Sequence, residues 1–188
     1  MSYYSFFSRI YEMGAEQMCR DCQDFIKRGS KILDLGCGSG IAAKKFQDFF
    51  ESEVLGVDIR DNRTVDIPFK IIDGKTLPFD EDAFDVTLIA YVLHHCKAPE
   101  ILLTEAKRVS QKIIIFEDIP EGILSKLRCK LHQLTFFGGK RGKFSFKTRE
   151  EWKELFQKLG LKVVAENWVS TKLDWLDPGK RALFFLEK

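Results

Sequence analysis

Three consecutive predicted strands of this chain end in residues that can hold a nucleoside or a phosphate. The first ends in the glycine-rich turn 36–40 (GCGSG), the second in Asp58, and the third in Asp73 and Gly74. Glycines let the backbone approach a ligand closely, and the helix that follows the turn offers backbone N–H groups and the positive end of a dipole. Asp58, 22 residues after Gly36, stands where an acidic residue accepts hydrogen bonds from both hydroxyls of a ribose. The three strand ends therefore predict a nucleoside-binding site.

The spacing of the glycines separates two classes of nucleoside site. The dinucleotide pattern G-x-G-x-x-G would need glycine at position 41, where this chain has Ile41, and its third glycine, Gly40, comes one residue early. A tight strand-to-helix connection without a ligand would also use these glycines, and Asp58 would then only begin a turn. The pattern favours a nucleoside that is not a dinucleotide.

Alternating strands and helices position these residues. Strands are expected at 31–36, 54–59, 69–72, 84–92, 112–119, 161–169 and 181–187, and helices at 5–27, 41–51, 99–109, 121–134 and 149–159. This alternation predicts an α/β fold with a doubly wound, mostly parallel sheet of seven strands. The last two strands, linked by a turn containing residues 177–179 (DPG), should form an antiparallel hairpin at one edge, so the C-terminal strand is antiparallel.

Several of these segments resemble a known family. Residues 32–40 (ILDLGCGSG) are similar to motif I of class I S-adenosylmethionine-dependent methyltransferases, and residues 56–58 (GVD) are similar to their motif II. Further matches are 73–74 (DG) with 77–79 (LPF), 84–86 (FDV) and 92–95 (VLHH). Together these segments resemble the type 11 subgroup, whose members are mostly small-molecule methyltransferases. The resemblance covers residues 30–119 and implies a Rossmann-like fold, S-adenosyl-L-methionine as cofactor and methyltransferase activity.

The resemblance also assigns the cofactor site. The implied binding residues are Asp34, Gly36, Cys37, Gly38, Gly40, Asp58, Ile59, Asp73, Gly74, Tyr91 and His94. The three glycines would line the methionine part, Asp58 would hold the ribose hydroxyls, and Asp73 with its glycine would contact adenine. Asp34 would orient the loop or reach the methionine amine, directly or through water. Tyr91 and His94 would border the sulfonium and the substrate.

Methyl transfer from a sulfonium is an in-line displacement, so the protein mainly has to align nucleophile, methyl and sulfur in a dry pocket. A general base is optional, and the candidates are His94, His95 and Glu117, with Asp118 beside them. Histidine is suited to this role because its ordinary pKa lies near neutrality. Alternatively, these side chains only satisfy backbone groups or cap the next segment.

The charge distribution indicates where the acceptor is recognised. The chain carries 30 basic and 28 acidic residues, a net charge of +2, yet residues 120–150 hold eight basic and two acidic side chains. We interpret the chain as one methyltransferase domain, 1–188, with a helical cover over the cofactor at 1–29 and a substrate lid at 120–147. The basic amphipathic stretch 121–137 could pack on the core, close over an anionic or lipid-like substrate, or dock on a membrane surface.

The predicted function is S-adenosylmethionine-dependent methyl transfer to a small-molecule or lipid-like acceptor. One alternative is an RNA methyltransferase, because residues 140–149 (KRGKFSFKTR) interleave basic and aromatic side chains, and another is a protein that binds the cofactor without catalysis. No metal is expected, since the pair Cys19 and Cys22 has no second pair, and no obligate protein partner is evident. We expect a cytoplasmic protein, because no apolar run reaches the roughly 20 residues of a membrane span and no signal peptide is recognisable.

Overall fold

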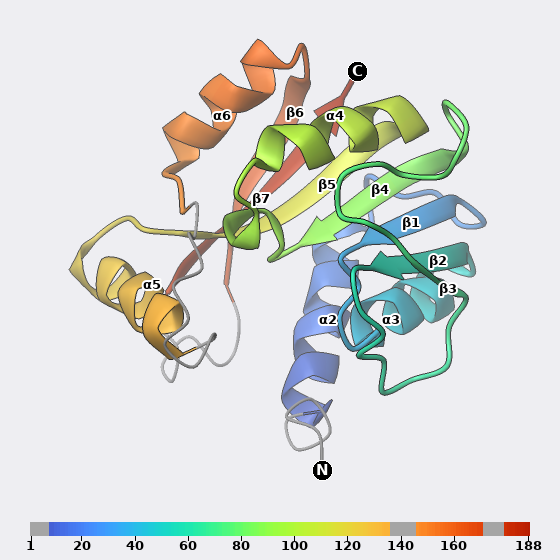
Figure 1. Ribbon diagram of the computed structural model, residues 1–188. Coiled ribbons are helices and arrows are strands. Elements are labelled where there is room, and N and C mark those ends of the chain that lie inside the picture. The colour runs from blue at the N-terminus through green and yellow to red at the C-terminus, as the bar shows by residue number, and fades with distance from the viewer. Residues whose placement is uncertain (1–7, 136–145, 171–178) are drawn as a thin grey trace.

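The computed structural model describes residues 8–135, 146–170 and 179–188. Its strands form one sheet of order β3-β2-β1-β4-β5-β7-β6 (Figure 1). The strands are β1 (Lys31–Leu35), β2 (Glu53–Asp58), β3 (Phe69–Ile71), β4 (Phe84–Ala90), β5 (Ser110–Ile119), β6 (Lys162–Val169) and β7 (Lys180–Glu187). The first five are parallel, and β7 lies antiparallel between β5 and β6. The predicted Rossmann-like α/β fold, with its antiparallel C-terminal strand, is confirmed.

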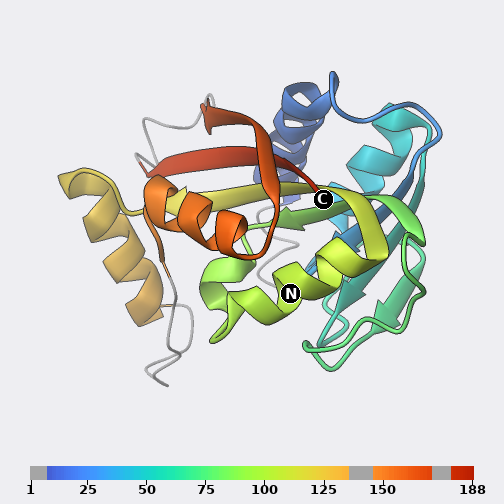
Figure 2. The same cartoon turned by 90° about the horizontal axis from the view of Figure 1, so that it is seen from above.

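Helices cover both faces of the sheet (Figures 1 and 2). They are α2 (Ser8–Cys22), α3 (Ile41–Phe50), the 3-10 helix η1 (Leu93–His95), α4 (Pro99–Val109), α5 (Ile123–Thr135) and α6 (Arg149–Lys158). Two apolar cores lie on opposite faces of the sheet, one against α4 and α6 and the other against α2 and α3. Figure 1 shows α5 apart from both layers, beyond the end of β5.

The two cores explain why the central strands are apolar almost without interruption. Side chains alternate between the faces of a strand. In β5, Ile113 and Ile115 join the core under α4 and α6, whereas Ile114 and Phe116 join the core under α2 and α3. Because both faces are buried, the sheet is a rigid support for the loops at its carboxyl edge.

β4 and the N-terminal helix end earlier than expected. β4 ends at Ala90 rather than at residue 92, because Tyr91 has a positive φ of 59° that ends the extended conformation. The N-terminal helix ends at Cys22 rather than at residue 27. The carbonyl oxygen of Cys22 accepts the N–H groups of Phe25 and Ile26 at 2.9 and 3.1 Å. Residues 5–7 of that expected helix and 177–178 of the expected hairpin turn lie outside the described residues. No helix within the described segments combines the length and the apolar character needed to cross a lipid bilayer.

Candidate active site

The glycine-rich turn connects β1 to α3 in a conformation that requires glycine. Gly36, Gly38 and Gly40 have φ values of 81°, 51° and 77°. A Cβ on Gly36 would lie 2.6 Å from Cγ2 of Val92, in the segment between β4 and η1. The turn therefore combines positive φ angles with a close approach to the chain that carries His94. The expected position of these glycines, between the first strand and its helix, is where the structure has them.

Backbone hydrogen bonds tie this turn to the neighbouring strand. The N–H groups of Gly36 and Cys37 donate to the carbonyl oxygen of Val57 in β2 at 2.8 and 3.1 Å. The thiol of Cys37 is turned into the core, because its Sγ would lie 2.8 Å from a Cβ on Gly56. Burial, followed by the charge of Asp34, raises the pKa of this thiol. At Cys37, only the backbone is therefore available for the site.

Asp58, the last residue of β2, connects the second strand to the turn. Its Oδ2 accepts the N–H of Gly38 at 3.0 Å, and its Oδ1 lies 3.4 Å from the N–H of Arg60. The side chain is half-buried. A carboxylate has about four acceptor positions, so Asp58 retains capacity for two hydroxyl donors while it fixes the turn.

Asp34 in β1 is a buried carboxyl group with an unpaired atom. The residue is 1% exposed, and its Oδ2 has no hydrogen-bond partner among the described residues. Burial, followed by the negative charge of Asp58, raises the pKa of Asp34 to about 7, against a hydrogen bond from the backbone of Ala43. A cationic donor beside this oxygen would satisfy it and favour its ionised form. The residues present therefore fit a cofactor that carries an ammonium group.

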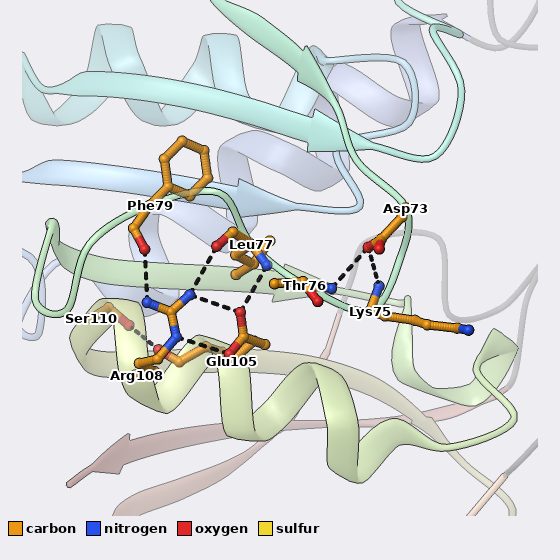
Figure 3. A network of polar contacts seen from close by, with 9 residues as sticks. Asp73, Lys75, Thr76, Leu77, Phe79, Glu105, Arg108 and Ser110 are labelled. Carbon is orange, nitrogen blue, oxygen red and sulfur yellow. Dashed lines mark hydrogen bonds and ion pairs between the residues drawn. The ribbon is translucent and has the colours of Figure 1, made fainter.

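The third strand end forms a turn and an apolar edge. Oδ1 of Asp73 accepts the N–H groups of Lys75 and Thr76 at 2.7 and 2.8 Å, and these hydrogen bonds lower the pKa of its carboxyl (Figure 3). Gly74 has a φ of 74°, and a Cβ there would lie 3.0 Å from Cγ2 of Ile59. Ile59 is 58% exposed, so it offers an uncovered apolar surface next to Gly74. Asp73 itself is exposed and is engaged with its own turn.

A clamp that the sequence reading missed holds this segment against α4 (Figure 3). Arg108 donates to the carbonyl oxygens of Leu77 and Phe79 at 2.8 and 2.7 Å, and Glu105 accepts the N–H of Leu77 at 2.8 Å. The two side chains also pair with each other at 2.8 Å. The spacing of three residues between Glu105 and Arg108 on a predicted helix could have indicated that the two side chains pair. It does not indicate that they also bind the segment with Leu77 and Phe79. The clamp positions the loop that begins at Asp73.

A buried histidine–carboxylate pair lies between the ends of β4 and β5. Nδ1 of His94 is 2.6 Å from Oε2 of Glu117, and the other oxygen of that carboxylate accepts the N–H of Leu93 at 2.7 Å. The two side chains are 1% and 0% exposed. Burial by itself lowers the pKa of His94, but the charge and hydrogen bond of Glu117 outweigh it, and the net result is a raised pKa. The ring of Phe146 stacks on His94 with centroids 4.7 Å apart.

The other candidates near His94 are arranged differently. The ring centroid of His95 is 4.1 Å from that of His94. Asp118 points away from His94, because it follows Glu117 along a strand, and it pairs with Arg128 of α5 at 2.8 Å. The pKa of Tyr91 is raised by burial and then by the charge of Asp118, so its hydroxyl remains neutral. The structure thus joins Glu117, and not Asp118, to the histidine.

The two lid candidates and the basic stretch are placed only in part. Within the N-terminal cover, Met18, Cys19 and Cys22 are buried in the core shared with α3. Residues 136–145 lie outside the described residues, and so does most of the stretch 140–149. The described end of that stretch is engaged within the chain, because Phe146 stacks on His94, and Lys147 and Arg149 lie over the rings of tryptophans 152 and 168.

Comparisons with known proteins bear on this site. A family model of the type 11 methyltransferase domain matches residues 33–113, which contain the glycine turn and the ends of β1, β2, β3 and β4. An uncharacterized protein of Methanocaldococcus jannaschii is 30% identical over 154 residues, which are 77% of this chain and 71% of that protein. This chain belongs to the class I S-adenosylmethionine-dependent methyltransferases. The cofactor of this family is S-adenosylmethionine.

Two further relatives show the extent of the likeness. A demethylmenaquinone methyltransferase of Paenarthrobacter aurescens is 30% identical over 120 residues, covering 57% of this chain and 46% of that enzyme. A solved S-adenosylmethionine-dependent methyltransferase from Mesorhizobium loti has the same fold, with a TM-score of 0.69, 15% identity, and coverage of 92% of this chain and 98% of that one. The chain spans less than half the length of the first curated relatives that it matches.

Proposed function

We propose that this chain transfers a methyl group from S-adenosylmethionine to a small-molecule or lipid-like acceptor, with His94 as the general base. The observation that carries the proposal is the hydrogen-bonded pair of His94 and Glu117 beside the glycine turn. In the predicted cofactor site the glycine turn holds the methionine part, and Asp58 holds the ribose hydroxyls. Ile59 and Gly74 provide the surface for adenine, and Asp34 receives the ammonium group.

S-adenosylmethionine, when bound, supplies a methyl group on a positively charged sulfur, and this sulfur leaves as a neutral thioether without needing a proton. The residues of this chain have two tasks: to orient the acceptor and to remove its proton. The N–H at Nδ1 of His94 donates a hydrogen bond to Glu117, so Nε2 is the nitrogen that takes a proton from the acceptor. The carboxylate also stabilises the imidazolium that forms. Burial of both side chains keeps water from competing with the acceptor.

The nature of the acceptor is inferred from the relatives and from the surroundings of the site. The Paenarthrobacter relative is named for demethylmenaquinone, and other matched relatives are named for ubiquinone and menaquinone biosynthesis. We further propose that the chain is a single domain in which a cover at 1–29 and a lid at 120–147 enclose the acceptor. An RNA acceptor is less well supported, because Phe146, Lys147 and Arg149 make contacts within the chain.

Incubation of the purified protein with S-adenosylmethionine and a panel of quinol, phenol, amine and carboxylate acceptors tests this proposal. Mass spectrometry should detect an acceptor that has gained one methyl group, together with S-adenosylhomocysteine. His94→Gln should lower the rate by about 100-fold or more, the usual contribution of a general base, while cofactor affinity changes little. His95→Gln, its neighbour without the Glu117 contact, is the matched control. Equal rates for the two variants would overturn the role of His94.

A further inference from the structure

Helix α5 turns an apolar face away from the rest of the described residues. Ile123, Leu124, Leu127 and Leu131 are 87%, 61%, 55% and 52% exposed. With 3.6 residues per turn, these four positions fall within an arc of about 100° on the helix surface. Of the three alternatives for this stretch, packing of the apolar face on the core is therefore wrong for these residues. A contiguous apolar arc of this kind marks an interaction site.

The opposite side of α5 explains this orientation, because polar contacts hold it to the protein. Ser125, which is buried, donates to the carbonyl oxygen of Ile119 and accepts the N–H of Lys180 at 3.1 Å. Arg128 pairs with the buried Asp118 at 2.8 Å. The helix is thus anchored to the ends of β5 and β7 through its polar residues. Reversing it to bury the leucines would break these contacts.

The charge of α5 indicates what covers the apolar arc. The helix contains no Asp or Glu, and its exposed Lys126 and Lys130 lie along one border of the arc. A symmetric contact with a second copy would bring the lysines of both copies together, which is unfavourable. The helix also contains no Phe, Tyr or Trp on which an RNA base could stack. An anionic lipid surface accepts both groups, because leucines enter the acyl boundary while lysine ammonium groups reach lipid phosphates.

We propose that α5 docks this protein on the surface of an anionic lipid bilayer. Ile123, Leu124, Leu127 and Leu131 enter the interface, and Lys126 with Lys130 bind phosphate headgroups. The helix follows directly on β5, whose end carries Glu117 and Asp118, so docking holds the edge with the histidine–carboxylate pair near the headgroups. A lipid-like acceptor would then reach the site without crossing water. The docking itself does not require methyl transfer, so it can be tested separately from the proposed activity.

Flotation with two kinds of vesicle tests the proposal: phosphatidylcholine alone, and phosphatidylcholine with about 30% phosphatidylglycerol. The wild-type protein should float with the anionic vesicles, less so in high salt, and stay behind with the neutral ones. Leu124→Glu/Leu127→Glu should abolish flotation. Lys126→Ala/Lys130→Ala should weaken binding by about 30-fold, since each lysine near an anionic surface contributes about 1 kcal/mol.

Two controls use the opposite end of the sheet. Val164→Glu adds a charge at a position of β6 that is 40% exposed. The preceding residue, Val163, pairs with Leu186 of β7, and Leu186 pairs with Ile113 near the start of β5, so this position is far from α5. Lys31→Ala/Lys162→Ala removes two exposed lysines at the starts of β1 and β6. Both controls should float like the wild type. Failure of the wild type to bind anionic vesicles, or equal binding by the Leu124→Glu/Leu127→Glu variant, would overturn the proposal. The proposal would also be overturned if sedimentation showed that the wild type is a dimer without lipid and that the Leu124→Glu/Leu127→Glu variant is a monomer.

Discussion

A substitution at Gly36 tests the close approach between the glycine turn and the segment that carries His94. The Gly36→Ala change adds a Cβ that would lie 2.6 and 2.9 Å from the two methyl carbons of Val92, at a φ of 81°. The positive φ costs roughly 1–2 kcal/mol, and the steric overlap adds about 1–3 kcal/mol. Gly29→Ala is the matched control, because Gly29 has a φ of 75° and an added Cβ there would meet no atom of the described residues within 4 Å. We therefore expect Gly36→Ala to cost about 1–3 kcal/mol more than the control.

Urea unfolding followed by circular dichroism measures this difference, with the denaturant slope as the check on two-state behaviour. A double-mutant cycle with Val92→Ala isolates most of the overlap, because removing the two methyl groups leaves only the Cβ of residue 92, at 3.3 Å, and should bring the cost of Gly36→Ala close to that of Gly29→Ala. If Gly36→Ala were no more destabilising than the control, or if Val92→Ala gave no relief, the turn would not contact this segment. The cofactor and acid–base halves of the site would then be separate.

Three further predictions concern charge and loop position. Glu117→Gln should lower the pKa of His94, because burial lowers that pKa and the Glu117 carboxylate raises it. The acidic limb of the pH–rate profile should therefore move to lower pH. The control Glu53→Gln should leave this limb in place. Asp34→Asn should stabilise the free protein above pH 7. The folded wild type binds this proton up to about pH 7 and the unfolded chain only up to about 3.8, so wild-type stability falls as pH rises between these values. The gain is up to about 4 kcal/mol in urea unfolding at pH 8 relative to pH 4, and a gain independent of pH would contradict it. Arg108→Ala should cost about 1–2 kcal/mol and weaken cofactor binding, because two loop carbonyls lose their donor; an unchanged Kd would show that the clamp does not position the loop.

The sequence predicted the sheet, the glycine turn and the ends of the first three strands because all of these depend on local patterns. Glycines with forced positive φ, and acidic residues directly after buried strands, fix where a turn and a strand end must be. The alternation of side chains along β5 also implies that Glu117 and Asp118 face opposite ways. Which of them contacts the histidine depends on the end of β4. There Tyr91 adopts a φ of 59°, which cannot be predicted from the presence of a tyrosine in the sequence.

The missed features depend on contacts between distant segments. Arg108 of the clamp binds carbonyl groups that lie 29 and 31 residues earlier in the chain, and the backbone pattern of those residues carries no signal for it. The orientation of α5 could not be predicted either. Its leucines follow a helical period that fits a buried face equally well, and only the anchoring of Ser125 and Arg128 decides that the face is turned outward.

Calorimetric titration of S-adenosylmethionine into the wild type, Asp58→Ala and Asp61→Ala tests the central claim most directly. Asp58 is the predicted ribose ligand, whereas Asp61 is exposed in the same loop and pairs with Arg63. The wild type and Asp61→Ala should bind with similar micromolar Kd values. Asp58→Ala should bind at least about 30-fold more weakly, since each hydrogen bond to a charged group contributes about 1.5–3 kcal/mol. No heat of binding to the wild type, or equal affinity of all three proteins, would contradict the assignment of the cofactor site.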